Sequence, residues 1–250
     1  MSRPKAGYRL ADGTKVPGVT TVIGRFKESG GLIWWANRLA FDPLGQAHAL
    51  LEGVQKRKPN REAIDKFLEV PLSAYDHNNA RDRAADAGTL AHAMVEAHLT
   101  GGDPDAETKG KPADVVSNAQ TAFLAFLEWA DSTKLKVVET ELSLVSEKHR
   151  YGGTLDARVL TVNGRLTIGD WKTSNGLYPD MLIQVAAYKS LFEETHPRQP
   201  VKGGLDIFRF SKDTGDFHHH HYDELTAGWE QFLLLRQAYE IDKELKKRAK

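Results

Sequence analysis

The hydrophobic period of this 250-residue sequence changes near residue 136, and no other feature constrains the fold as strongly. Before that point apolar residues recur at helical spacing, whereas the segments that follow alternate with a period of two, which is typical of β-strands. Strands are expected at 136–144, 153–162 and 165–171, joined by a turn at 148–153 and by the hairpin signal Asn163-Gly164. A helix is predicted next over 179–194, then strands at 201–210 and 217–222 with a turn at 213–215, then an amphipathic helix from about 223. This order predicts an α/β fold, in which helices flank both faces of a central mixed β-sheet.

The N-terminal third of the chain carries a weaker pattern. Residues 1–25 are expected to be extended, because Tyr8 and Val16 flank an Asp12-Gly13 turn signal and the segment PGVTTVI is rich in β-branched residues. Helical spacing predicts helices over 32–51, 81–99 and 113–131, with short helices between 52 and 80. The chain is therefore expected to have an N-terminal extended segment and helical cap over 1–80, and a core over 81–250.

The composition narrows the class of protein. With 40% apolar and 27% charged residues, the chain resembles a globular protein, and no apolar run approaches the roughly 20 residues that span a bilayer. The absence of cysteine excludes disulfides, thiolate zinc sites and cysteine-ligated iron–sulfur clusters. The N-terminus also lacks the apolar stretch of a signal peptide, so a cytoplasmic protein is expected. The formal net charge of zero neither favours nor excludes nucleic acid, because binding depends on a local basic surface.

An acid and a lysine stand at the end of the third predicted strand, in the segment LTIGDWK. Asp170 and Lys172 are two residues apart and therefore project from the same face of the strand, where they could form a simple ion pair. Asp156, however, lies on the preceding strand, and a tight hairpin would bring residue 156 near residue 171, with its carboxylate beside that of Asp170. Two buried carboxylates repel each other unless a cation lies between them. Oxygen ligands of this kind suit Mg²⁺ or Mn²⁺, and Lys172 could then position a water and offset charge on a phosphate.

A predicted helix supplies a further candidate ligand. His92 and Glu96 are four residues apart and share one helix face. His92 is either a packed core histidine or a third metal ligand, and the surrounding alanines, which leave room for a close approach to the sheet, favour the ligand. Glu96 could serve a second metal ion or lie at the surface.

The helix after the third strand carries another pair of polar residues at the same spacing. Gln184 and Tyr188 are either a boundary pair on an amphipathic helix or groups that hold Lys172 and a DNA phosphate. Thr173 and Ser174, directly after the lysine, could donate hydrogen bonds to phosphate as well.

A run of four histidines, 218–221, falls in the last predicted strand. Alternate side chains of a strand point to opposite faces, so at most two of these histidines can converge on one metal ion. The run resembles a metal cluster or a tag, and its internal, strand-like position disfavours metal binding.

The candidate residues occur in an order that resembles a known group of enzymes. The segments GGTLDARV, IGDWKTS and QVAAYK, preceded by Gly88-Thr89 and His92, resemble the motifs of the PD-(D/E)xK nuclease superfamily, in its RecB-like exonuclease branch. Phage-type exonucleases and the mitochondrial genome maintenance exonuclease are similar. The chain has Asp-x-Lys where many relatives have Glu-x-Lys, which is a mild departure because a shorter carboxylate can still ligate a metal.

The resemblance implies a restriction-endonuclease-like core and a role for each candidate residue. It implies metal ligation by His92, Asp156, Asp170 and the main-chain carbonyl of Trp171, catalysis by Lys172, and orientation of the lysine or the DNA by Gln184 and Tyr188. Glu141, on the first strand, matches an acidic position of relatives, and a structural or supporting role is expected for it.

The resemblance also implies a function. It implies a DNA exonuclease that hydrolyses phosphodiester bonds by metal-activated water, with one or two Mg²⁺ or Mn²⁺ ions and no iron–sulfur cluster, and that acts on a single strand or a duplex end. The setting would be DNA recombination, repair or replication in a bacterial host or a phage-infected cell, with a homo-oligomer or a partner recombination protein as further options. The alternatives are a structure- or site-specific endonuclease, a catalytically silent DNA-binding domain, and a nuclease that acts on RNA.

Overall fold

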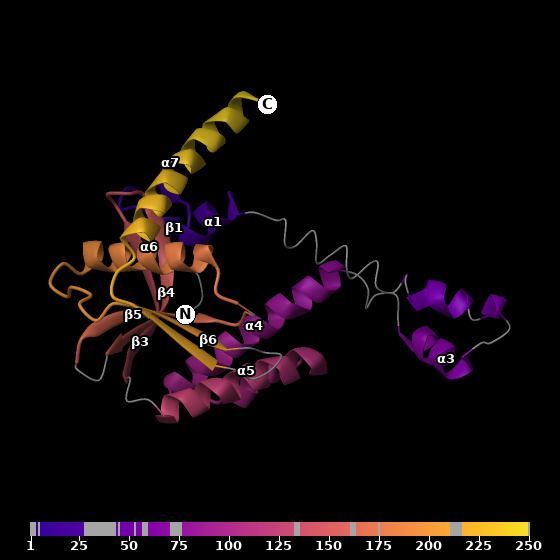
Figure 1. Ribbon diagram of the computed structural model, residues 1–250. Helices are drawn as coiled ribbons and strands as arrows, with labels where there is room; N and C mark the ends of the chain where they lie inside the picture. Colours follow the sequence, from indigo (N-terminus) through magenta and orange to yellow (C-terminus); the bar gives the residue numbers. More distant parts are fainter. Residues whose placement is uncertain are drawn as a thin grey trace. The chain divides into compact units, whose positions relative to one another are not determined.

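The fold is described from a computed structural model (Figure 1). The described residues are 4, 6–27, 44, 46–52, 54–56, 60–70, 77–132, 136–160, 164–174, 176–210 and 217–249. The chain divides into two compact units. The core unit consists of Met1–Lys27 with Gly88–Lys250, and the smaller unit consists of Glu28–Ala87. This division differs from the expected one at residue 80, because the first 27 residues pack with the core unit.

A five-stranded mixed sheet organises the core unit. Its strands lie in the order β3 (Lys136–Ser146), β4 (Tyr151–Leu160), β5 (Leu166–Lys172), β6 (Leu205–Phe210) and β7 (Phe217–Tyr222). Neighbouring strands are antiparallel except β5 and β6, which are parallel and are joined by the crossover helix α6 (Pro179–Thr195). The predicted mixed α/β fold is therefore confirmed, with each predicted strand within a few residues of its observed bounds.

Helices cover both faces of this sheet, as Figure 1 shows for α5 and α6. On the α6 side, Ile168, Leu205 and Ile207 are fully buried against α6 and against Phe232 of α7 (Thr226–Arg248). On the other side, α5 (Ala113–Ser132) places Trp129 4.6 Å from Phe208, measured between ring centroids. Apolar residues on alternate positions of β5 and β6 thus bury both faces, as expected for central strands.

The remaining helices agree with the sequence pattern to within a few residues. α4 (His77–Leu99) begins earlier than residue 81 and contains Gly88 in its interior, and the loop after it includes the short 3₁₀ helix η2 (Pro104–Thr108). In the smaller unit, α3 (Arg61–Glu69) is capped by Asn60, whose side chain accepts a hydrogen bond from the Ala63 amide at 3.1 Å. The helix predicted over 32–51, residue Asn163 and the turn at 213–215 lie wholly or largely outside the described residues.

The prediction of an extended N-terminal segment is wrong in part. Only β1 (Tyr8–Arg9) and β2 (Lys15–Val16) are strands, whereas Val19–Gly24 forms the helix α1. The β-branched residues favoured a strand, but Val19, Val22 and Ile23 recur at helical spacing and are all buried in the core. Packing of this apolar face therefore outweighs the local strand preference.

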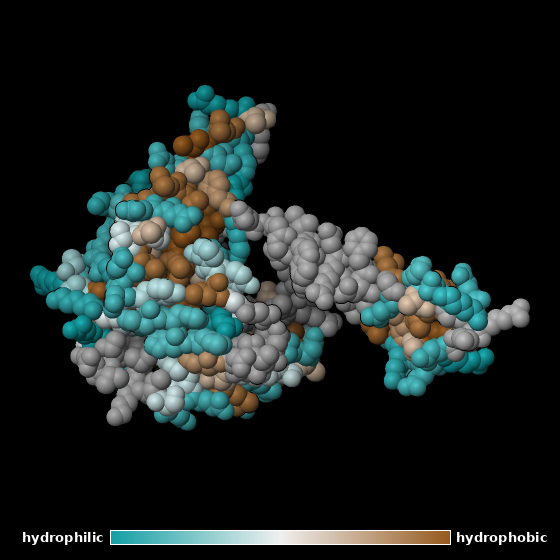
Figure 2. All heavy atoms as spheres, viewed as in Figure 1, coloured by the Kyte–Doolittle hydropathy of each residue, from teal (hydrophilic) through white to brown (hydrophobic). Residues whose placement is uncertain are grey.

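Surface hydropathy is uneven over the core unit. Figure 2 shows hydrophobic residues interleaved with hydrophilic ones along α7, where Leu234, Ile241 and Leu245 are exposed. Among the described residues, no helix combines the length and the hydropathy that a membrane crossing requires.

The N-terminal segment is anchored on β4 through Gly152. The Gly152 amide donates a hydrogen bond to the Pro17 carbonyl at 3.0 Å, and the ring of Tyr8 lies over the glycine. A β-carbon at residue 152 would lie 2.2 Å from Cγ of Tyr8, so no larger side chain fits without displacing that ring. The Tyr8 hydroxyl bonds to Thr154 Oγ1 at 2.9 Å, which fixes the ring in place.

We predict that Gly152→Ala lowers the free energy of unfolding by about 2–3 kcal/mol, because the new methyl group overpacks against Tyr8. Urea denaturation would measure the change, and in a Tyr8→Ala background the same substitution should cost much less. Gly24→Ala is the matched control, since a β-carbon there meets no atom within 4 Å. An equal cost of Gly152→Ala with and without the tyrosine ring would contradict this packing argument.

Candidate active site

Two aspartates meet where β4 and β5 run side by side. Ala157 pairs with Gly169 in the register of these two strands. The next pair in the same register is Asp156 opposite Asp170, which is one residue away from the expected partner, residue 171. Oδ2 of Asp156 also accepts a hydrogen bond from the Trp171 amide at 3.0 Å. Burial raises the pKa of Asp170 to about 7, and the charge of Asp156 adds to that effect although Lys172 opposes it. Burial likewise raises the pKa of Asp156. The two carboxyl groups therefore hold protons more tightly than exposed aspartates do.

Lys172 follows Asp170 on the same face of β5, and its ammonium forms an ion pair with Oδ2 of Asp170. Burial alone would lower the pKa of Lys172, but the charges of Asp170 and Asp156 outweigh it and raise the pKa above its ordinary value. The lysine is therefore a fixed positive charge beside the two acids.

His92 comes from α4 and lies against the same carboxylates. Its Nδ1 is 4.0 Å from Oδ2 of Asp156, and about 30% of its side chain stays exposed. Desolvation and then the charge of Lys172 lower the pKa of His92 to about 4, so the imidazole is neutral near pH 7. The backbone of Trp171 opposes this shift and favours the protonated ring, which indicates that the Trp171 main chain lies beside His92. A neutral imidazole retains a free lone pair, which is the state that can ligate a metal ion.

Glycine allows α4 to approach the end of β5 this closely. Gly88, about one helical turn before His92, faces Thr173, and a β-carbon at residue 88 would lie 2.5 Å from Thr173 Oγ1. The Gly-Thr-x-x-His pattern thus combines a small residue at the contact with His92 one turn later.

Two glutamates extend the acidic cluster. Burial raises the pKa of Glu141 to about 7, and the charge of Glu96 on α4 adds to this effect. The charge of Glu141 in turn contributes to the raised pKa of Asp156, so the acids form one electrostatic group. Glu141 has a positive φ of 54°, which is uncommon for a residue with a side chain. Such a conformation is retained where the surroundings demand it, and functional sites are frequent examples.

Gln184 and Tyr188, the pair on α6, lie on the α6 side of Asp170. Gln184 Nε2 donates hydrogen bonds to Oδ1 of Asp170 at 3.2 Å and to the Tyr188 hydroxyl at 3.0 Å. Tyr188 is buried with 4% of its surface exposed, and its ring is close enough to Gly153 that a β-carbon there would lie 2.7 Å away. Burial and then the charge of Asp170 raise the pKa of Tyr188 well above its ordinary value, so its hydroxyl stays protonated. This geometry suits the orientation of Asp170, rather than the contact with a DNA phosphate that the sequence suggested.

The loop after Lys172 is held by an arginine that the sequence reasoning did not single out. Arg209 pairs with Lys172 in the register of β5 and β6, and its Nη1 donates a hydrogen bond to the Ser174 carbonyl at 2.8 Å. The Ser174 hydroxyl donates to the Gly176 carbonyl at 2.8 Å, and its oxygen can still accept a hydrogen bond. The signal for Arg209 was a single cation in the run LDIFRF, where Asp206 is the other charged residue.

The donor set of this cluster fits a hard divalent cation. Asp170 is fully buried, and its Oδ2, apart from the ion pair with Lys172, has no hydrogen-bond partner among the described residues. Two aspartates, the Trp171 carbonyl and the neutral His92 could hold one ion, while Glu141 and Glu96 add carboxylate oxygens nearby. An oxygen-rich set of this kind is typical of Mg²⁺ or Mn²⁺ sites.

Comparisons with known proteins give only distant likenesses. The sequence matches no protein-family model and no curated protein. A candidate exonuclease from Eubacterium rectale is 12% identical, with a TM-score of 0.41 over 61% of this chain and 68% of that one. An alkaline exonuclease from Laribacter hongkongensis is 16% identical, with a TM-score of 0.34 over 67% of this chain and 91% of that one. The assignment of function below therefore rests on the residues and their geometry.

We predict that Glu141→Gln stabilises the metal-free protein at pH 8 but hardly changes it at pH 4. The pKa of Glu141 in the folded chain is about 7 against an ordinary value of 4.5, so its ionisation costs folding free energy as the pH rises through that interval. Glutamine cannot ionise and therefore removes this cost. The measurement is urea denaturation in EDTA at the two pH values, with the exposed Glu128→Gln as control. A gain at pH 4 as large as at pH 8 would contradict the prediction.

Proposed function

We propose that this protein is a metal-dependent nuclease that hydrolyses the phosphodiester bonds of DNA. The observation that carries the proposal is the buried pair Asp156 and Asp170, with the ammonium of Lys172 on one side and the neutral ring of His92 on the other. Acids, a histidine and a lysine from three separate elements converge on one point, which a structural ion pair does not require.

The residues have distinct roles in this proposal. His92, Asp156, Asp170 and the Trp171 carbonyl hold one Mg²⁺ or Mn²⁺ ion, and Glu141 with Glu96 supports a second. The ion, when bound, supplies Lewis-acid chemistry: it activates water and neutralises charge on the phosphate.

The other groups position the reactants. With Asp170 engaged as a ligand, the ammonium of Lys172 would be free to turn toward the scissile phosphate, where it would orient the attacking water and offset the charge that develops. Gln184, braced by Tyr188, keeps Asp170 in the orientation that ligation needs. Thr173 and Ser174 lie next to the lysine, and Arg209 holds the Ser174 carbonyl. The Thr173 hydroxyl donates to the phosphate backbone, and the Ser174 hydroxyl does so once it turns away from the Gly176 carbonyl.

The exonuclease activity is proposed from the motif resemblance. The activity would begin at the end of a strand or of a duplex, and it would serve recombination, repair or replication of DNA in a bacterial or phage-infected cell. An endonuclease of the same superfamily is the second candidate, because the same metal and lysine chemistry cuts internal bonds equally well.

We predict that Lys172→Ala lowers the rate of DNA cleavage at least about a hundredfold, while DNA binding changes by only a few fold. The rate would come from digestion of end-labelled DNA in Mg²⁺ or Mn²⁺, and binding from fluorescence anisotropy in Ca²⁺. Lys202→Ala, which removes an exposed lysine before β6, is the matched control. Cleavage by the Lys172 variant at the normal rate would remove this mechanism, and a wild-type chain that binds DNA without cutting it would identify a silent nuclease-like domain.

We also predict that linear DNA is degraded whereas a covalently closed circle resists. The physical reason is access: an active site that needs a free end finds none on a closed circle. Equal molar amounts of supercoiled and linearised plasmid, incubated with the same protein and Mg²⁺, would separate the two candidates. Rapid nicking of the circle would favour the endonuclease, and degradation of single-stranded RNA at the same rate would broaden the substrate class.

A further inference from the structure

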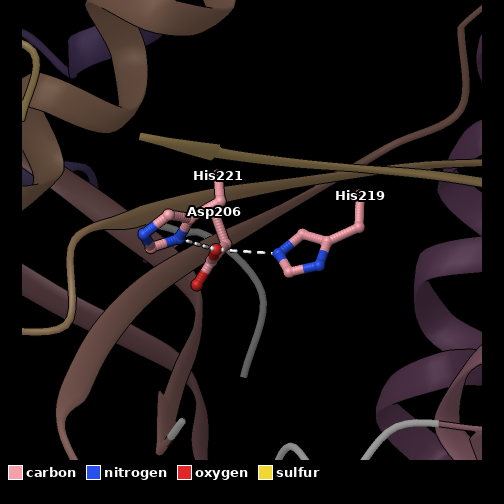
Figure 3. Close-up of side chains that lie close together, drawn as sticks. All are labelled: Asp206, His219 and His221. Atoms are coloured by element: carbon pink, nitrogen blue, oxygen red, sulfur yellow. Dashed lines mark hydrogen bonds and ion pairs between the residues drawn. The ribbon is translucent and has the colours of Figure 1, made fainter. Parts of the chain in front are cut away.

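A second group of potential ligands lies on β6 and β7. Asp206 pairs with His221 in the register of these strands, and His219 lies two residues along the same face. Nδ1 of His221 and Nε2 of His219 are 2.7 and 2.8 Å from the same oxygen, Oδ1 of Asp206. Figure 3 shows the two imidazoles approaching this carboxylate from opposite sides.

This group lies on the opposite face of the sheet from Lys172 and Asp170. Asp170 pairs with Ile207, so the neighbouring Asp206 points to the other side of the sheet. Its surroundings agree, because the ring of His219 packs 5.0 Å from Phe208 and 6.2 Å from Trp129 on α5. The group is therefore separate from the candidate active site.

Asp206 is buried to an unusual degree for an acid, with 1% of its surface exposed. Its second oxygen, Oδ2, is buried and has no hydrogen bond among the described residues, although the Thr167 hydroxyl lies close enough to favour the ionised form. Burial alone would raise the pKa of Asp206, but hydrogen bonds, first from His219 and then from His221, outweigh it and lower the pKa. The carboxylate is thus held ionised, with one oxygen shared by two imidazoles.

We propose that Asp206, His219 and His221 form a binding site for a transition-metal ion of the Zn²⁺ type. One ligand atom from each residue lies within 4.8 Å of the other two, which is a separation that one ion can bridge. A set of two imidazole nitrogens and one carboxylate binds Zn²⁺, Co²⁺ or Ni²⁺ in preference to Mg²⁺. Three protein ligands leave a fourth position for water.

A small movement converts the hydrogen-bonded arrangement into a metal site. Bonds of about 2.0–2.2 Å around a tetrahedral ion place neighbouring ligand atoms about 3.3 Å apart. The nitrogens stand 2.7 and 2.8 Å from Oδ1, so each must move away from this oxygen by about half an ångström and release the proton that it shares with the carboxylate. The two nitrogens, which lie within 4.8 Å of each other, must also turn to one side of the carboxylate. Nε2 of His221 is 3.6 Å from Oδ1 of Asp223, which can accept a hydrogen bond from the Nε2–H group and so favour the tautomer whose Nδ1 ligates.

The position of the site indicates what the ion does. Among the strands of the described residues, β7 lies at the edge of the sheet and pairs with β6 alone. An ion that joins His219 and His221 to Asp206 ties this edge strand to the buried strand beside it. The ion therefore stabilises the sheet edge without taking part in phosphodiester hydrolysis.

The histidine run supplies its own matched control, because His218 and His220 lie on the other face of β7. Three variants test the site in a chain that also carries Asp156→Asn and Asp170→Asn, which removes the carboxylates of the active site: His219→Ala with His221→Ala, His218→Ala with His220→Ala, and Asp206→Asn. Binding of Co²⁺ is followed by its visible absorption, and Zn²⁺ by the shift in melting temperature. Circular dichroism verifies that each variant is folded.

We expect one tight Co²⁺ with the absorption of a low-coordinate ion in the parent chain and in the His218/His220 variant. Loss of His219 and His221, or of the Asp206 charge, should weaken binding by more than about tenfold and abolish the rise in melting temperature. Equal weakening by both histidine pairs would mean that the run binds metal as an unstructured tag does, and would overturn the proposal. The absence of tight binding in the parent chain would overturn it as well, whereas DNA cleavage in Mg²⁺ by the chain with intact aspartates tests the nuclease proposal independently.

Discussion

The active-site region depends on one constraint: the free-energy cost of holding two buried carboxylates, those of Asp156 and Asp170, side by side. Removal of an ion from water costs several kcal/mol even after relaxation, and a second like charge adds to that cost. Lys172 supplies one positive charge for Asp156 and Asp170, and Glu141 adds a further acid to the same group. Without a metal ion the cluster lowers its energy by retaining protons, as the raised pKa values of Asp170 and Glu141 indicate. The folded chain thus holds a cluster in which a divalent cation can replace protons.

The fold builds this cluster by bringing rigid helices and strands to the C-terminal end of β5. β5 is antiparallel to β4 on one side and parallel to β6 on the other, so its C-terminal end receives Asp156 from one neighbour and Arg209 from the other. The crossover helix that parallel strands require is α6, and it delivers Gln184 to Asp170. Because regular elements position these groups, the ligands need little ordering when an ion binds.

The sequence predicted the parts of this arrangement that follow from local periodicity. The strands and helices of the core unit, and the approach of Asp156 to Asp170 across one hairpin, follow from alternation and turn chemistry. The helix α1 was missed because its β-branched residues favour a strand in isolation, and only the core shows that Val19 and Val22 share a buried face. The positive φ of Glu141 and the contact of Arg209 with the Ser174 carbonyl depend on pairing between strands, which periodicity does not encode. For the same reason Asp206 could not be joined to His219 and His221 from sequence, since the register of β6 and β7 decides which side chains meet.

The alternation of side chains along β5 and β6 also separates the two proposed metal sites. Asp170 faces α6 among oxygen donors, whereas Asp206, across the sheet, faces two imidazoles beside α5. Zn²⁺ generally binds a given set of ligands more tightly than Mg²⁺, so affinity alone would let a trace transition metal displace the ion of an oxygen-rich site. A nitrogen-rich site on the opposite face would bind that metal preferentially, because neutral imidazoles suit it better than carboxylates do. Because successive residues of a strand project to opposite faces, one pleated sheet can keep the two proposed ions apart without any additional domain.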